Sequence, residues 1–171
     1  MAFNHRADLN PHQQYRIKKL KRELNRAETY AEWKEIALSL DQETGAQEWK
    51  YDNSSPYFDA EIISHRLNML RRYKLQNRVV DLIYILREGL SHDVANIGHP
   101  MLFTQTYVGT KKIIEDYIHE VCESLIFIAS QKCDSLSIKE KIDFFQNCQL
   151  AYGQPAMMFS GGASLGLFHT G

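Results

Sequence analysis

The chain has 171 residues, of which 44% are hydrophobic and 24% are charged, and its formal net charge is −1. This length is enough for one compact domain with a core of its own. Because the charges nearly balance, no global field draws the protein to nucleic acid or to an anionic membrane. The charge is nevertheless uneven, since residues 1–28 carry seven basic side chains against three acidic ones (Arg6, Arg16, Lys18, Lys19, Lys21, Arg22 and Arg26; Asp8, Glu23 and Glu28).

The cysteine pattern excludes two common kinds of site. Cys122, Cys133 and Cys148 are odd in number and widely spaced, so neither a disulfide framework nor a zinc site fits. A reducing, intracellular compartment is the simplest interpretation. The N-terminus has no apolar signal core, and no apolar run approaches the ~18–20 residues that span a bilayer. We therefore expect a cytoplasmic protein, or one bound peripherally to a membrane or lipid droplet, with no metal and no cofactor.

Helical spacing of apolar residues runs through the first half of the chain. Pro11 can open a helix that extends to about Ala27, with apolar residues at Ile17, Leu20 and Leu24. The rest of its surface is mostly basic, and its apolar stripe has no Trp or Phe. Contact with a membrane or lipid-droplet surface, ordinary packing and a solvated face are therefore all open interpretations of this helix.

A capping box predicts the next helix. Thr29 lies three residues before Glu32, the spacing at which two side chains cap a helix start. Gly45 is expected to end this helix, and the polar, turn-rich residues 50–56 are predicted to form a loop. The apolar stripe is expected at Trp33, Ile36, Ala37 and Leu40.

Helical spacing returns at Asp59 and continues in a second apolar run. The run at residues 79–86 is apolar on most sides, which predicts a central position. Gly89 and residues 96–100 break the chain after it. The helix that begins at Asp59 should bury one face, made of Ile62, Ile63, Leu67 and Leu70.

The longest predicted helix covers residues 107–131, and a shorter one follows it. Ser137 and Glu140 have capping-box spacing, and Ile138, Ile142 and Phe145 continue the apolar pattern from there. The apolar stripe of the long helix is expected at Ile113, Ile114, Tyr117, Ile118, Val121, Leu125 and Ile128.

The sequence changes character after Tyr152. Gly153 and Pro155 end the helical region, residues 156–159 form a short apolar run, and a glycine-rich segment follows directly. A short strand that runs into a glycine-rich turn is typical of the start of an α/β domain. Because a single strand would leave its backbone groups unpaired, we expect the sequence to be the N-terminal part of a longer chain.

The glycine-rich residues 161–166 carry the clearest chemical signature, and the motif alone leaves three interpretations open. They can form a cradle of backbone N–H groups for an anion, although Ala163 departs from the dinucleotide-binding pattern. They can form a nucleophile elbow, since residues 162–166 satisfy G-x-S-x-G with Ser164 as the attacking residue. They can also be a tight turn that uses glycine for its backbone angles.

Residues 158–171 closely resemble the first strand and glycine-rich loop of patatin-like phospholipases. The chain is most similar to the triacylglycerol-lipase branch of that family, which carries a helical segment before the patatin domain. The resemblance covers roughly residues 30–171, and its helical part is more specific than the glycine loop. The matching helical stretches are residues 33–37, 57–67, 86–90, 96–100, 114–121 and 139–145.

The resemblance implies a serine hydrolase with a Ser-Asp dyad. In this family the glycine-rich loop supplies oxyanion N–H groups, and the nucleophilic Ser and the Asp follow later, beyond this chain. Gly161 and Gly162 match the oxyanion glycines, Gly166 matches the closing glycine, and Ala163 replaces the commoner third glycine. Ser164 falls in the variable part of the loop, so its elbow match is coincidental under this interpretation and it remains an alternative nucleophile.

Other polar residues have ordinary explanations. His169 is expected on a helix surface, and structural roles are also expected for the scattered His65, His92, His99 and His119. A group of cations is expected to form a solvated face, with a lipid surface or partner as the next option and nucleic acid as a remote one. This group is Arg66, Arg71, Arg72 and Lys74.

The sequence thus predicts three parts: a basic N-terminal extension at 1–28, a helical domain at 29–152 and the start of a three-layer α/β/α patatin domain at 153–171. The expected function of the intact protein is hydrolysis of lipid esters, either triacylglycerol or phospholipid, with no nucleic-acid partner. Two alternatives stay open: a non-catalytic helical module that regulates or targets a lipase, and a phosphate- or nucleotide-binding α/β protein.

Overall fold

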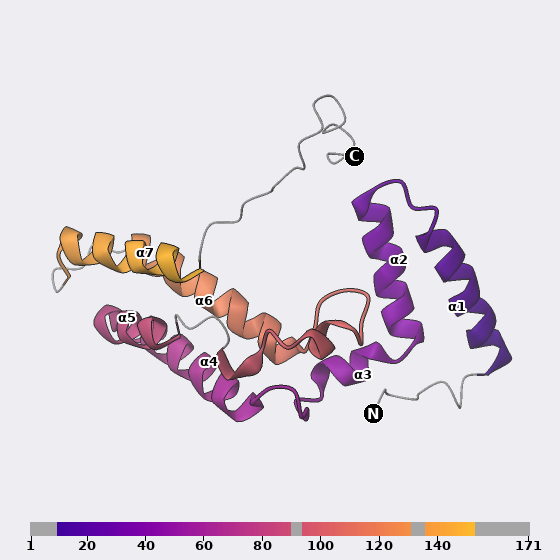
Figure 1. Ribbon diagram of the computed structural model, residues 1–171, viewed down its shortest axis with the longest axis horizontal. Coiled ribbons are helices and arrows are strands. Elements are labelled where there is room, and N and C mark those ends of the chain that lie inside the picture. The colour runs from indigo at the N-terminus through magenta and orange to yellow at the C-terminus, as the bar shows by residue number, and fades with distance from the viewer. Residues whose placement is uncertain (1–9, 90–93, 131–135, 153–171) are drawn as a thin grey trace, which may run out of the picture.

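The computed structural model describes residues 10–89, 94–130 and 136–152, and the regular secondary structure of these residues is helical (Figure 1). No β-strand occurs in the described residues, which agrees with the predicted helical region, and residues 153–171 lie outside them. The elements in chain order are α1 (Pro11–Leu24), α2 (Tyr30–Glu43), α3 (Ala46–Tyr51), α4 (Ala60–Leu75), α5 (Val79–Glu88), the short 3-10 turns η2 (Val94–Asn96) and η3 (Pro100–Phe103), α6 (Lys112–Ser130) and α7 (Ile138–Tyr152).

Capping residues set the helix starts. At α2 the Thr29 side chain accepts a hydrogen bond from the Glu32 backbone while Glu32 reaches back to the Thr29 backbone. The box predicted at Ser137 starts α7 in the same way. A third box, at Asn10 and Gln13, starts α1 and was not predicted. Each box satisfies backbone N–H groups that a helix start would otherwise leave unpaired.

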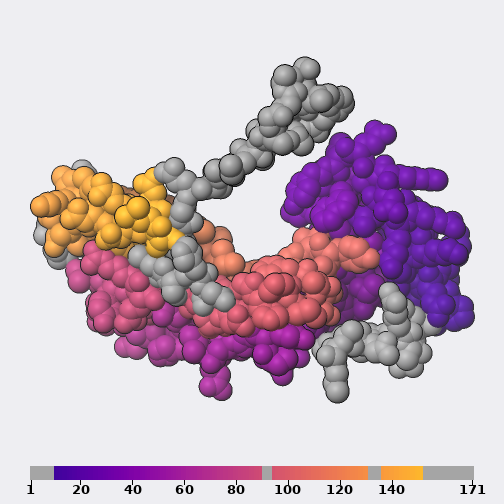
Figure 2. Space-filling model, viewed as in Figure 1, coloured from indigo at the N-terminus to yellow at the C-terminus, as the bar shows by residue number. Residues whose placement is uncertain are grey.

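The helices form a bundle at one end of the molecule and a hairpin at the other (Figure 1). Helix α4 packs along α6, and α5 folds back against both of them. Helices α1 and α2 pack on each other, and α3 joins this hairpin to the bundle. The space-filling view shows a broad hollow between the hairpin and the end of the bundle that carries α7 (Figure 2).

The main core lies inside the bundle. It draws on α4, α5, α6 and α7, with Phe58 and Leu102 added from the connecting segments. Residues 79–86 were predicted to be apolar on most sides and central, but α5 buries only one face, and Val80 and Tyr84 on the other face are 52% and 66% exposed. The buried members from the helices are Ile63, Leu67, Leu70, Val79, Leu82, Ile83, Ile85, Leu86, Ile114, Tyr117, Ile128, Phe144 and Cys148.

Several predicted boundaries were wrong by a few residues. Helix α1 ends at Leu24 rather than near Ala27. Gly45 does end α2, with a left-handed φ of 73°, but a short helix begins immediately after it. Lys50 and Tyr51, predicted to lie in a loop, are the last residues of this helix, α3. A six-residue helix is too short to show a periodic apolar pattern.

The long helix and the one after it also differ from prediction. Helix α6 begins at Lys112, so residues 107–111, predicted to be helical, belong to a loop. In α7 the buried residues are Phe144 and Cys148, whereas Ile138 and Ile142 are 79% and 51% exposed. Of the predicted apolar pattern of α7, Phe145 does pack against the core, whereas Ile138 and Ile142 turn outward. Ile62 and Ile118 likewise turn outward rather than into the core.

Cys122 is exposed and Cys148 is buried, and both are free thiols. Burial raises the pKa of the Cys148 thiol above its ordinary value, so this thiol is protonated and inert at neutral pH. None of the described helices combines the length and the apolar character needed to cross a bilayer.

Candidate functional site

The glycine-rich segment predicted to carry chemistry lies outside the described residues. This holds for the oxyanion candidates Gly161, Gly162, Ala163 and Gly166, and for Ser164. His169 and the predicted strand at residues 156–159 are also outside them. The structure therefore bears on function through the polar and charged residues of the helical region.

The most enclosed polar group is a set we call the loop anchor, made of Asp41, Lys50, Lys111 and loop residues 104–111. Asp41 is fully buried at the end of α2. Its two carboxylate oxygens accept the backbone N–H groups of Tyr107 at 2.7 Å and of Val108 at 3.0 Å. The Lys50 amine lies 3.7 Å from Asp41 and donates to the Val108 carbonyl. The buried carboxylate is thus paired and hydrogen-bonded, as burial of a charge requires.

Lys111 is also fully buried and has no ion pair among the described residues. Its Nζ donates to the carbonyl oxygens of Trp49 at 2.8 Å and Asp52 at 2.5 Å, with Ser54 O at 3.4 Å. It also lies 4.2 Å from the centre of the Trp49 ring, a cation–π contact. The Trp49 and Asp52 carbonyls lie at the C-terminal end of α3, where the helix dipole favours a cation.

The chemistry of Lys111 follows from this geometry. Burial lowers its pKa below the ordinary lysine value, and Asp52 opposes the shift. A lowered pKa alone would suggest a nucleophilic amine. However, a lysine ammonium has three N–H donors, and all three are used here by backbone carbonyls. Lys111 therefore acts as a cross-link between the start of α6 and the end of α3.

Gly109 completes the loop anchor. Its φ of 74° lies in the left-handed region, and a Cβ there would collide with the Glu115 carboxylate. That carboxylate accepts the Thr110 backbone N–H at 2.9 Å in the first turn of α6. The Thr110 hydroxyl in turn donates to the Leu102 carbonyl at 2.6 Å. Glycine at this position lets the loop pass closely enough for these bonds to form.

Three of the four cations of α4 form cross-links, while Arg71 and Arg72 keep the exposure expected of the predicted solvated face. Glu120 of α6, which is buried, lies 2.6 Å from the Lys74 amine and 3.4 Å from Arg71. Arg66 donates to the Ile85 carbonyl at 2.7 Å and contacts the Tyr117 hydroxyl at 3.4 Å. Of the four cations, Arg72 alone is left with no partner in the described residues. Lys74 and Arg71 compensate the buried Glu120 carboxylate and link α4 to α6, and Arg66 links α4 to α5 and α6.

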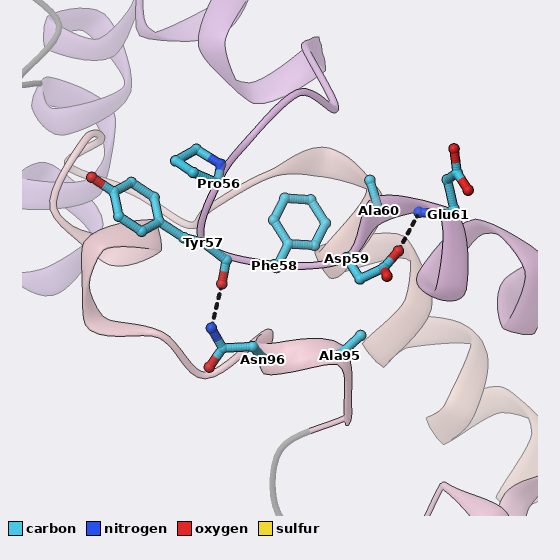
Figure 3. Close-up of a pocket in the computed structure, with 8 residues that line it drawn as sticks. All are labelled: Pro56, Tyr57, Phe58, Asp59, Ala60, Glu61, Ala95 and Asn96. Carbon is cyan, nitrogen blue, oxygen red and sulfur yellow. Dashed lines mark hydrogen bonds between the residues drawn. The ribbon is translucent and has the colours of Figure 1, made fainter.

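A shallow depression lies beside the start of α4 (Figure 3). The Asn96 side chain donates to the Tyr57 carbonyl at 2.6 Å, and the Asp59 backbone N–H donates to the Ala95 carbonyl at 3.0 Å. Ala95 and Asn96 both have positive φ, 54° and 61°. The Asp59 carboxylate accepts the backbone N–H of Glu61 at 3.0 Å (Figure 3). The polar groups here are used to join two segments and to cap a helix.

The histidines show no metal-ligand arrangement in the part of the chain that the structure describes. There, no group of three or more His, Cys, Asp or Glu side chains is placed to hold a metal ion. His99 has the structural role that was predicted, because its Nδ1 accepts the Met101 backbone N–H at 3.2 Å. Its ring also stacks on Tyr57, with the ring centres 4.8 Å apart.

The loop anchor was not predicted from the sequence. Asp41 and Tyr107 are far apart along the chain, and no local spacing rule connects them. The one local signal is Gly109, which interrupts a segment predicted to be helical and marks a turn before α6.

Comparison with known proteins assigns this helical fold to a family. The model of a family described as "Domain of unknown function (DUF3336)" matches residues 11–150, and the chain belongs to this family. The match includes α1 to α6 and nearly all of α7. No solved structure matches the chain.

The relatives are lipases and patatin-like proteins by name. The chain is 33% identical over 143 residues to triacylglycerol lipase ptl1 of Schizosaccharomyces pombe, which covers 84% of this chain and 26% of the relative. It is 33% identical over 157 residues to triacylglycerol lipase SDP1L of Arabidopsis thaliana, and this alignment covers 92% of the chain and 19% of the relative. It is also 33% identical over 153 residues to a patatin-like phospholipase domain-containing protein of Cryptococcus neoformans, CNBE2340. That alignment covers 90% of the chain and 17% of the relative.

These matches confirm the resemblance to the triacylglycerol-lipase branch of the patatin-like family. The chain spans about a quarter or less of the length of these three curated relatives.

Proposed function

We propose that the protein hydrolyses lipid esters, triacylglycerol or phospholipid, as a patatin-like serine lipase. The observation that carries this proposal is the alignment of 84% and 92% of the chain with two relatives named triacylglycerol lipases. The helical residues account for most of that alignment. A shared short glycine motif would be much weaker support, since such motifs recur on unrelated folds.

In this proposal the glycine-rich loop stabilises the oxyanion. The tetrahedral intermediate of ester hydrolysis carries negative charge on the former carbonyl oxygen, and fixed backbone N–H groups lower its energy. Gly161, Gly162, Ala163 and Gly166 would supply these donors, and glycines allow the backbone to approach the ester. The nucleophilic Ser and the Asp of the dyad would lie C-terminal to this chain.

The described helices would form a non-catalytic part of the lipase. The buried charges Asp41, Lys111 and Glu120 are all engaged in cross-links between helices and loops. This favours a second candidate function for the chain by itself: a rigid module that regulates or targets a lipase. The two functions are compatible in one protein.

The same proposal divides the chain and places it in the cell. Residues 1–28 would be a basic extension, 29–152 a helical domain, and 153–171 the first strand and oxyanion loop of an α/β/α patatin domain. The substrate would be met at a membrane or lipid-droplet surface inside the cell, without a metal or cofactor.

The experiment that tests the assignment of Ser164 uses the 171-residue chain. The purified chain is given a short activated ester, with Ser164→Ala as the matched variant. We expect no turnover above buffer for either protein, since the proposed dyad is not in the chain. Turnover that disappears in Ser164→Ala would make Ser164 the nucleophile and overturn the proposed mechanism.

A further inference from the structure

We infer that the outward face of α1 binds the headgroups of anionic phospholipids at a lipid surface. This face consists of Tyr15, Lys18, Lys19 and Arg22. The inference rests on the proposed function in one respect, since a lipid-hydrolysing protein must meet a lipid surface. It adds which side of the chain makes that contact and which lipid class it selects.

Helical geometry separates the two faces of α1. Ile17, Leu20 and Leu24 are half-buried and pack on α2, while no residue of α1 is fully buried. With 3.6 residues per turn, Tyr15, Lys18 and Arg22 fall on the opposite side. Helix α1 forms the outer edge of the molecule, beyond α2 (Figures 1 and 2). The apolar face of α1 is therefore occupied, and no described residue covers the basic face, whose four members are all exposed.

The cations of this face converge and are only partly paired. Tyr15, Lys18, Lys19 and Arg22 line one small hollow of about 140 Å³. Lys19 lies 3.7 Å from Glu23, a long contact between exposed groups that is worth little. Lys18 and Arg22 make no ion pair with any described residue. Three cations around one hollow suit a phosphate oxygen, which accepts hydrogen bonds from several donors at once.

Neighbouring charges limit the length of the polyanion that can bind. In α1, five cations accompany one acid, whereas α2 carries one cation and three acids outside the core, Glu32, Glu35 and Glu43, since Asp41 is buried. Arg16 of α1 is tied to one of those acids, Glu43, at 3.0 Å. A long nucleic acid would extend past the basic face onto this acidic helix. A flat array of separate headgroups can instead contact the outer edge alone.

Tyr15 favours a lipid surface in particular. Its side chain is 68% exposed at the centre of the basic face. Tyrosine has an apolar ring and a polar tip, and it concentrates at the boundary between headgroups and acyl chains. Clustered basic side chains are attracted to anionic headgroups, and the exposed ring of Tyr15 lies among these side chains. Because the apolar stripe is packed against α2, the contact should be electrostatic and shallow.

The test is sedimentation of the 171-residue chain with vesicles of phosphatidylcholine alone, or of phosphatidylcholine mixed with phosphatidylserine. The variant is Lys18→Gln/Lys19→Gln/Arg22→Gln. The matched control is Lys34→Gln/Arg72→Gln/Lys139→Gln, which removes the same charge from exposed cations of other helices. Circular dichroism checks that all three proteins are equally helical. No hydrolysis is measured, so failure of this test leaves the lipase proposal standing.

We expect binding to the phosphatidylserine vesicles and much weaker binding to phosphatidylcholine. Each cation near an anionic surface contributes about fivefold in affinity, so the α1 variant should lose on the order of 100-fold while the control keeps most of its binding. Raising salt from ~0.1 M to ~1 M should release the chain, because the Debye length falls from ~10 Å to ~3 Å. Three results would overturn the inference: equal binding to both vesicles, equal losses in the variant and the control, or full displacement by a short RNA at equal charge.

Discussion

At the residue scale, the loop anchor depends on one backbone conformation. Gly109 has a positive φ and sits against the Glu115 carboxylate, whereas Gly45 has nearly the same φ with open space around it. The two glycines therefore separate the effect of backbone strain from the effect of a collision. An L-amino acid other than glycine in the left-handed region costs about 1–2 kcal/mol of stability.

We predict that Gly109→Ala lowers the free energy of unfolding more than Gly45→Ala does. Gly45→Ala should cost about 1–2 kcal/mol from strain alone. Gly109→Ala should cost at least about 1 kcal/mol more, because it also displaces Glu115 from the Thr110 backbone N–H. Urea unfolding of the two variants measures the difference. Equal losses would mean that the loop does not pass as close to α6 as the structure places it.

Lys111 gives a second prediction at this scale. Lys111→Met should lower the free energy of unfolding by about 2 kcal/mol, since it leaves the carbonyls of Trp49 and Asp52 without their donor. Lys34→Met, on the exposed side of α2, should change it by less than about 0.5 kcal/mol. Similar values for the two variants would show that the Lys111 cross-link contributes no net stability.

The lowered pKa of Lys111 predicts how the difference in stability between wild type and Lys111→Met changes with pH. Below its folded-state pKa the lysine is charged in both states, and the cost of burying the charge is fully present. As pH rises from that pKa toward the ordinary lysine value, the folded state releases its proton first. The unfolded state then binds more protons, so stability rises with pH. The stability of wild type relative to Lys111→Met should therefore increase in alkaline solution, as measured by urea unfolding at several pH values.

At the element scale, local signals were reliable at the two helix starts with a predicted capping box and weak elsewhere. The boxes at Thr29 and Ser137 were predicted because each cap involves residues only three apart. The start of α6 was placed too early because Tyr107 and Val108 extend its apolar pattern, yet they are held by Asp41 from α2. Contacts between distant segments override local pattern, and no spacing rule reveals them.

Helix α7 shows that a local pattern also fails to predict which face of a helix is buried. Ile138, Ile142 and Phe145 have helical spacing, but of these only Phe145 packs against the core, and the buried residues are Phe144 and Cys148. Both faces of this helix carry apolar side chains, so periodicity alone could not choose between them. The contact with the bundle, where Arg87 of α5 lies 5.9 Å from the centre of the Phe144 ring, decides which face is buried.

The register of α7 can be tested by two truncations. Phe144→Ala should lower the free energy of unfolding by about 3–5 kcal/mol, because it removes a fully buried ring and leaves a cavity. Ile138→Ala, at a side chain that is 79% exposed, should change it by less than about 0.5 kcal/mol. A large loss for Ile138→Ala with a small loss for Phe144→Ala would restore the face expected from the sequence alone.

At the scale of the whole molecule, the sequence predicted the class of the chain better than its arrangement. The mainly helical region and the family resemblance are both confirmed. The division into a bundle and a hairpin was not predicted (Figure 1). It depends on the Lys111 cross-link to α3 and on the ion pairs of Glu120, which involve residues distant in the chain. The proposed oxyanion glycines remain predictions, as they lie outside the described residues.

The protein is proposed to be a patatin-like lipase whose oxyanion donors include Gly162. The most direct test is release of fatty acid from a triacylglycerol emulsion by the longest natural form of the protein, compared with its Gly162→Val variant. We predict that wild type releases fatty acid and that the variant, with an unchanged circular dichroism spectrum, loses on the order of 100-fold in kcat with a smaller change in KM. The reason is that oxyanion contacts form mainly in the transition state. No hydrolysis by wild type, or equal kcat for a well-folded variant, would contradict the account.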